Sequence, residues 1–86
     1  MTTVELNPGD AANVGGLLRQ IGKGKELSPE LRSNVTYWAK TMHRRMDRRD
    51  VQAVTGLLLD LSDDFRMSAE YRHSALYWAG YLQGRL

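Results

Sequence analysis

The chain has 86 residues, of which 42% are hydrophobic and 26% charged, and its net charge is +2. This composition is typical of a folded globular protein, and the length allows one domain, residues 1–86, with a thin core. The absence of cysteine excludes disulfides, thiolate metal sites and cysteine nucleophiles. The start, MTTVELNPGD, lacks a basic segment followed by an apolar run, so we expect neither a secretion signal nor a membrane span, and a cytoplasmic location.

A 40-residue repeat organises the chain. The tripeptide Tyr-Trp-Ala occurs at 37–39 and again at 77–79, and residues 7–46 align with 47–86 without a gap. Twelve of the aligned pairs are identical, whereas chance would give about two or three. The sequence therefore predicts an internal duplication with repeat unit one at 7–46 and repeat unit two at 47–86.

Each unit is expected to form two helices. In unit one, Asn7 followed by Pro8 predicts a helix start and a helix over 8–21, and Ser28 followed by Pro29 predicts a second helix over 29–46. In unit two, Asp47 and Ser68 stand at the matching positions and predict helices over 48–61 and 69–85. Six-residue loops, GKGKEL and SDDFRM, join the helices within each unit. Almost no linker separates the second helix from the third, so we expect a sharp corner at Asp47.

Apolar residues recur at helical spacing and give each helix one buried stripe. The stripes are Ala11, Val14, Leu17, Leu18 and Ile21; Leu31, Val35, Trp38, Ala39, Met42 and Met46; Val51, Val54, Leu57, Leu58 and Leu61; and Tyr71, Ala75, Trp78, Ala79, Leu82 and Leu86. Both tryptophans are expected in the core. The predicted fold is all-α: two tandem 40-residue αα-hairpin repeats packed as a compact four-helix domain with pseudo-twofold symmetry, since two repeats are too few for an open solenoid.

Two pairs of residues match between the units outside these stripes. Gly16 and Gly56 lie near the middle of the polar faces of their helices, and Tyr37 and Tyr77 lie opposite the apolar stripes of theirs. One interpretation is that each tyrosine covers the glycine gap of its own hairpin. The other is that each pair forms a surface groove for a partner.

The outward faces of the second and fourth helices differ, although they occupy matching positions. His73, Tyr77, Gly80, Tyr81 and Gly84 give the fourth helix an uncharged face, and Leu59 adds apolar surface on the third helix. Glycines four residues apart allow another helix to approach closely, and tyrosine is enriched at interfaces. We therefore predict a partner-binding or self-associating surface there, or alternatively side chains that complete the packing of the small domain.

The matching region of unit one is basic. Lys40, Arg44, Arg45, Arg48 and Arg49 form a cluster within residues 40–49, and unit one has a net charge of +4 against −1 for unit two. Such a cluster can contact phosphates or an acidic partner, or form a solvated corner. Asp47 and Asp50 interrupt it, and the six-residue loops are longer than the turn of a helix-turn-helix motif.

No catalytic constellation is apparent. Glu70 and His73 form a single Glu-x-x-His, the matching residues are Glu30 and Ser33, and neither His43 nor His73 belongs to a triad-like pattern. There is no Walker-type phosphate loop. We therefore expect no enzyme activity, no cofactor and no metal site.

The sequence predicts a small, non-enzymatic helical binding module that acts by occupying a surface on a partner protein of unknown identity. The prediction includes a homodimer, in which the partner is a second copy of the chain. Its size suits accessory proteins of phages or mobile elements. The alternative is a regulator that binds nucleic acid through the cluster at residues 40–49. No membrane partner is expected.

Overall fold

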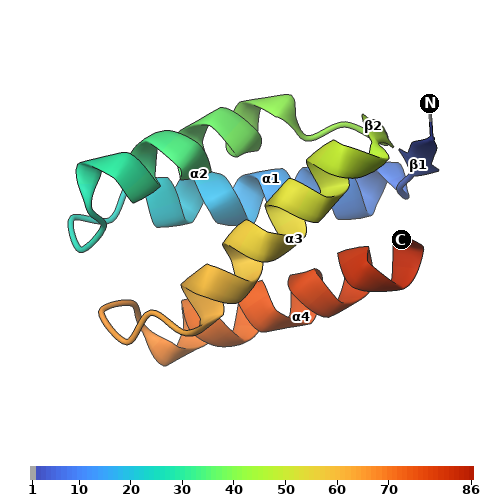
Figure 1. Cartoon of the computed structure of the whole chain (residues 1–86). Helices are drawn as coiled ribbons and strands as arrows, with labels where there is room; N and C mark the ends of the chain where they lie inside the picture. Colours follow the sequence, from blue (N-terminus) through green and yellow to red (C-terminus); the bar gives the residue numbers. More distant parts are fainter. Residues whose placement is uncertain (1) are drawn as a thin grey trace.

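The computed structural model describes residues 2–86 and contains four helices and a short two-stranded ribbon (Figure 1). The elements in chain order are β1 (Thr3–Glu5), α1 (Pro8–Gly22), α2 (Pro29–Thr41), β2 (Arg45–Asp47), α3 (Arg48–Ser62) and α4 (Ala69–Arg85). Helices α1 and α2 pack as one antiparallel hairpin, and α3 and α4 pack as a second. The all-α prediction with two tandem hairpins is confirmed, while the duplication that would explain them stays a prediction.

The helices begin where the capping residues predict. The Asn7 side chain accepts a hydrogen bond from the Gly9 amide at 3.0 Å, and Asp47 accepts one from Arg49 at 2.8 Å. At α2 and α4, the hydroxyls of Ser28 and Ser68 accept from the amide three residues later. These bonds satisfy amides that have no partner within the helix and so fix all four starts. Six residues separate the helices within each hairpin, as expected.

The predicted end of the second helix is wrong. Helix α2 stops at Thr41 instead of continuing to residue 46, and Met42 already has extended backbone angles. The chain then forms β2, which pairs antiparallel with β1 in a register that places Val4 opposite Met46. Both of these side chains are buried, as is Leu6. The hydrogen-bonded ribbon and the burial of these apolar side chains outweigh continuation of the helix, and the predicted sharp corner is instead a six-residue connection.

The register of the ribbon relates the two hairpins. Glu5 and Arg45 are opposite each other although they are 40 positions apart, which is the offset between the two hairpins. An antiparallel pair that joins two equivalent positions is the arrangement that a twofold axis between them requires. The Leu6 amide donates to the Arg44 carbonyl at 2.6 Å, and the Arg48 amide donates to the Thr2 carbonyl at 3.0 Å, which extends the pairing on both sides.

One continuous core fills the space between the hairpins and the ribbon. Its largest fully buried side chains are Leu18, Leu58, Leu61, Leu82, Val14, Val35, Val51 and Val54. The two tryptophans are half-buried and pack against this core from its edge, so the predicted inward position is right but the centre is aliphatic. Each indole meets the edge of the preceding tyrosine: Tyr37 and Trp38 have ring centroids 4.9 Å apart, and Tyr77 and Trp78 are 5.0 Å apart.

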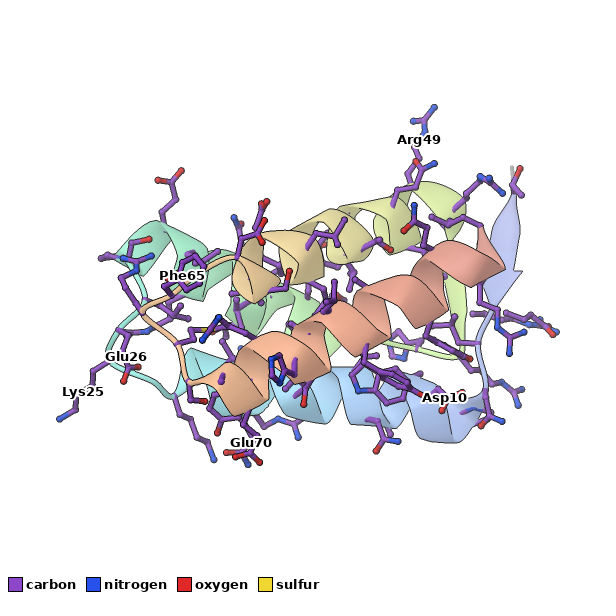
Figure 2. All side chains as sticks on the ribbon, turned by 90° about the horizontal axis from the view of Figure 1, so that it is seen from below. Asp10, Lys25, Glu26, Arg49, Phe65 and Glu70 are labelled. Atoms are coloured by element: carbon purple, nitrogen blue, oxygen red, sulfur yellow. The ribbon has the colours of Figure 1, made fainter. Side chains whose placement is uncertain are left out.

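The loops of both hairpins lie at the end of the molecule opposite the ribbon (Figure 1). Phe65 and Lys25, one from each loop, mark this end in Figure 2. Leu27 and Met67, which occupy matching positions, are both buried there.

In the second loop, two hydrogen bonds from the Arg66 guanidinium, at 2.8 and 3.0 Å, lower the pKa of the Asp64 carboxyl group.

The two adjacent glycines of α1 have different surroundings, which gives a test of the hairpin packing. A Cβ on Gly15 would lie 3.4 Å from the Ala39 carbonyl oxygen and 3.6 Å from Met42, whereas a Cβ on Gly16 would have no neighbour within 4 Å. We expect Gly15→Leu to lower the free energy of unfolding by about 1–3 kcal/mol, because the longer side chain must displace α2. Gly16→Leu, the matched control, should be neutral or raise it by up to about 1 kcal/mol. Urea denaturation of both variants measures the difference, and equal effects would contradict the packing described.

Candidate functional site

Four of the six predicted partner-binding residues gather on one exposed side of α4. His73, Tyr77, Gly80 and Gly84 are all exposed, and at 100° per residue they fall with Leu76 within an arc of about 100°. We call these five residues the outer face of α4. Tyr77 is 67% exposed and Leu76 is 56% exposed. The face thus combines two large side chains in water with two positions that have no side chain.

Leu76 is the member of this face that the sequence reasoning missed. It falls outside the apolar stripe that predicted the core of this helix, and the aligned residue of unit one is Thr36. The same helical wheel could therefore have identified it. An exposed leucine is unremarkable alone, but one beside an exposed tyrosine forms a patch.

Leu59 is the predicted partner-binding residue on α3. Its side chain is 38% exposed, and its aligned residue in the first hairpin is Arg19. In that hairpin, Arg19 and Thr36 line one shallow groove between α1 and α2. The aligned residues of the second hairpin, Leu59 and Leu76, are both apolar. That Leu59 takes part in binding a partner stays a prediction.

Tyr81 lies in a different environment from the one predicted. It is half-buried, its ring meets the edge of Trp78 with centroids 5.5 Å apart, and the Arg85 guanidinium lies 5.2 Å from its centroid. Its hydroxyl oxygen is buried and has no hydrogen-bond partner among the described residues. Tyr81 therefore lies at the edge of the core instead of on the outward face of α4. Its part in binding a partner stays a prediction.

The two glycines of the outer face have no visible role in the packing of the chain. Outside the backbone of α4 itself, no atom of residues 2–86 comes within 4 Å of the position that a Cβ would take at Gly80 or Gly84. Glycine inside a helix costs about 0.5–1 kcal/mol relative to alanine. Gly80 and Gly84 therefore each lower the stability of α4 relative to alanine, and no contact among the described residues explains either glycine.

The interpretation that tyrosines cover the glycine gaps is wrong for both hairpins. A Cβ on Gly16 or Gly56 would also have no neighbour within 4 Å, so neither Tyr37 nor Tyr77 lies over these positions. Each tyrosine instead packs against the tryptophan that follows it. Whether these positions form a groove for a partner stays a prediction.

The predicted basic cluster is divided among three places. Lys40 lines the groove between α1 and α2, together with Arg19, Lys23 and Thr36. Arg44 and Arg45 lie beside the end of β1, where the Arg45 guanidinium contacts the Glu5 carboxylate at 2.9 Å.

Arg48 and Arg49 lie at the opposite end of the ribbon, beside Thr2 and Asp47. Arg49 extends away from the body of the molecule in Figure 2. The carboxylates of Glu5 and Asp47 therefore lie among these arginines. Binding of nucleic acid or of an acidic partner here stays a prediction.

Among residues 2–86, no group of three His, Asp or Glu side chains is arranged to hold a metal ion. None of the described helices is both long enough and apolar enough to cross a membrane. A scan against models of protein families, a search of curated proteins and a search of solved structures each found no match to this chain.

The unpartnered hydroxyl of Tyr81 leads to a stability prediction. A buried hydroxyl without a hydrogen bond costs about 1–3 kcal/mol. We expect Tyr81→Phe to raise the free energy of unfolding by about 1 kcal/mol, since the ring contacts with Trp78 remain and the buried oxygen is removed. Thermal denaturation provides the measurement. Tyr77→Phe, at an exposed position, should have almost no effect, and a loss of stability in Tyr81→Phe would show that its hydroxyl has a partner.

The open glycines lead to a second stability prediction. We expect Gly80→Ala and Gly84→Ala each to raise the free energy of unfolding of the monomer by about 0.5–1 kcal/mol, because alanine favours the helix and meets no neighbour. Urea denaturation at low protein concentration measures this. Destabilisation by either substitution would show that the chain itself needs the glycine.

Proposed function

We propose that this protein is a small, non-enzymatic binding module whose contact surface is the outer face of α4. The observation that supports this most strongly is the exposure of Leu76 and Tyr77 next to Gly80 and Gly84, whose missing side chains serve no contact within the chain. A helix face of this kind offers a partner apolar area together with close approach to the helix backbone. Tyrosine is also among the residues that carry most binding energy at interfaces.

The uneven distribution of exposed apolar side chains supports the same surface. Five large hydrophobic side chains are exposed among the described residues: Tyr37, Leu59, Phe65, Leu76 and Tyr77. Four of these belong to the second hairpin. The first hairpin has the same helical arrangement but carries Arg19, Thr36 and Lys40 where the second has Leu59, Leu76 and Gly80. Because the first hairpin folds without this apolar surface, the fold alone does not require it in the second.

The proposed mode of action is occupation of a complementary apolar surface on a protein. A partner that covers the face removes Leu76 and Tyr77 from water, and the hydrophobic effect favours such burial. The absence of Lys, Arg, Asp and Glu from the outer face means that no charged side chain on it must lose its water when the surface is covered. An accessory role in a phage or mobile element remains part of this proposal and is based on the small size of the chain.

A matched pair of variants tests the proposal. We expect Tyr77→Glu to abolish retention of the bound protein in a pull-down from source cells, because it places a carboxylate in the centre of the contact. Tyr37→Glu, at the aligned and similarly exposed position of α2, should retain it. Circular dichroism checks that both variants fold, and the retained protein is identified by mass spectrometry and tested again after purification.

Two results would contradict the proposal. One is a retained protein that binds the wild type and Tyr77→Glu equally. The other is loss of retention in Tyr37→Glu alone, which would place the contact on α2. Binding of duplex DNA with a steep salt dependence that is lost in Arg48→Ala or Arg49→Ala would instead support the nucleic-acid alternative.

A further inference from the structure

We propose that the outer face of α4 binds the same face of a second copy of this chain, with the two α4 helices antiparallel. This inference rests on the proposed function and names the partner of that surface. It is based on the order of residues along the face, on the charges at the two ends of α4, and on the contrast with α2.

The order of residues makes the face complementary to itself. His73 and Tyr77 lie one helical turn apart, and Gly80 and Gly84 follow with the same spacing. When two such helices pair antiparallel with their midpoint between Trp78 and Ala79, Tyr77 of one copy faces Gly80 of the other, and His73 faces Gly84. Each of these contacts occurs twice because the pairing has a twofold axis.

Tyr77 and His73 thus each face a position where the opposite helix has no side chain. Gly80 and Gly84 have open space where a Cβ would be, so the ring of Tyr77 and the imidazole of His73 can approach the opposite backbone. The exposed ring of Tyr77 and the side chain of Leu76 lose contact with water in the process. The dimer therefore buries the two large exposed apolar side chains of the face and uses its two glycines, whose Cβ positions are open in the isolated chain.

Charge distinguishes the antiparallel pairing from the parallel one. Glu70 in the first turn and Arg85 in the last turn are both exposed and lie on the same side of the outer face, about 20° and about 80° beyond its edge at Tyr77. The Arg85 guanidinium lies 5.2 Å from the centroid of the Tyr81 ring on that side. In the antiparallel register, Glu70 of one copy lies within about half a turn of Arg85 of the other in height, so opposite charges lie on the same side at both ends of the contact. A parallel pair would place like charges together and align the two helix dipoles unfavourably.

Helix α2 could not form the same contact. Lys40 and Arg44 take the places of the two glycines, and α2 ends at Thr41, before the second of them. In the equivalent antiparallel pairing, Tyr37 would face a lysine instead of a gap, and two lysines would be brought close together. The difference between the two hairpins therefore selects α4 as the dimerisation helix.

The size of the face predicts a weak dimer. A 17-residue helix is about 25 Å long, and one helix against another covers less than the roughly 800 Å² per partner of a standard interface. We therefore expect a monomer at low concentration and increasing dimer as the concentration rises towards about 1 mM.

Disulfide trapping tests the register directly, because the chain has no cysteine of its own. His73→Cys and Gly84→Cys are purified separately, mixed in equal amounts and allowed to oxidise in a glutathione buffer. Residue 73 faces residue 84 only between two copies, whereas identical thiols are about 16 Å apart along the helices, too far for a disulfide. We expect the mixed disulfide to exceed each symmetric one by about tenfold or more, measured by intact mass.

Ser33→Cys mixed with Gly84→Cys is the matched control, since Ser33 aligns with His73 on α2. This pair should give only the statistical ratio of products. In parallel, sedimentation of the unmodified chain between about 1 µM and about 1 mM should show reversible dimer formation that Tyr77→Glu abolishes and Tyr37→Glu retains.

The outcomes separate this inference from the proposed function. A monomer at about 1 mM, a statistical disulfide ratio, or dominant disulfides between identical positions would overturn the antiparallel dimer. If retention of another protein still depends on Tyr77 in that case, the binding function of α4 stands and its partner is that protein. If neither dimerisation nor retention depends on Tyr77, both proposals fail.

Discussion

The antiparallel pairing of β1 with β2 is the constraint on which the arrangement of the two hairpins depends. Each strand lies just before the first helix of its hairpin, so pairing the strands also brings the starts of α1 and α3 to the same end of the molecule. Val4, Leu6 and Met46 are buried beneath the ribbon and connect it to the common core. The ribbon fixes both the register and the direction of the two chain segments that precede α1 and α3.

The starts of the helices could be read from the sequence because capping is a local interaction. Asn7, Ser28, Asp47 and Ser68 each bind an amide two or three residues away, so their role does not depend on the rest of the fold. The end of α2 depends on pairing with a strand about 40 residues away in the chain. No glycine or proline at residues 41–43 indicates that a helix ends there. A weak signal did exist in β1, where Thr3, Val4, Glu5 and Leu6 alternate between polar and apolar residues.

The candidate site could be predicted in part, for the same reason. His73, Tyr77, Gly80 and Gly84 share a face through helix periodicity alone, which the sequence contains. The position of Tyr81 depends on how its ring packs against Trp78. Tyr77 is exposed and Tyr81, about one helical turn later, is half-buried. The basic cluster is continuous in the sequence, but its residues belong to α2, β2 and α3 because the chain changes from helix to strand and back within it.

The paired tyrosine and tryptophan rings have a spectroscopic consequence. In both hairpins an indole borders the aliphatic core and meets one tyrosine edge at nearly the same distance and angle. Trp78 differs through its additional contact with the ring of Tyr81. Because the two indoles share the core-edge position and the tyrosine contact, their emission will overlap strongly. The tryptophan fluorescence of the unmodified chain therefore reports both hairpins together. Replacing either indole by phenylalanine would leave one tryptophan in each variant and so allow the opening of each hairpin to be followed separately by tryptophan emission.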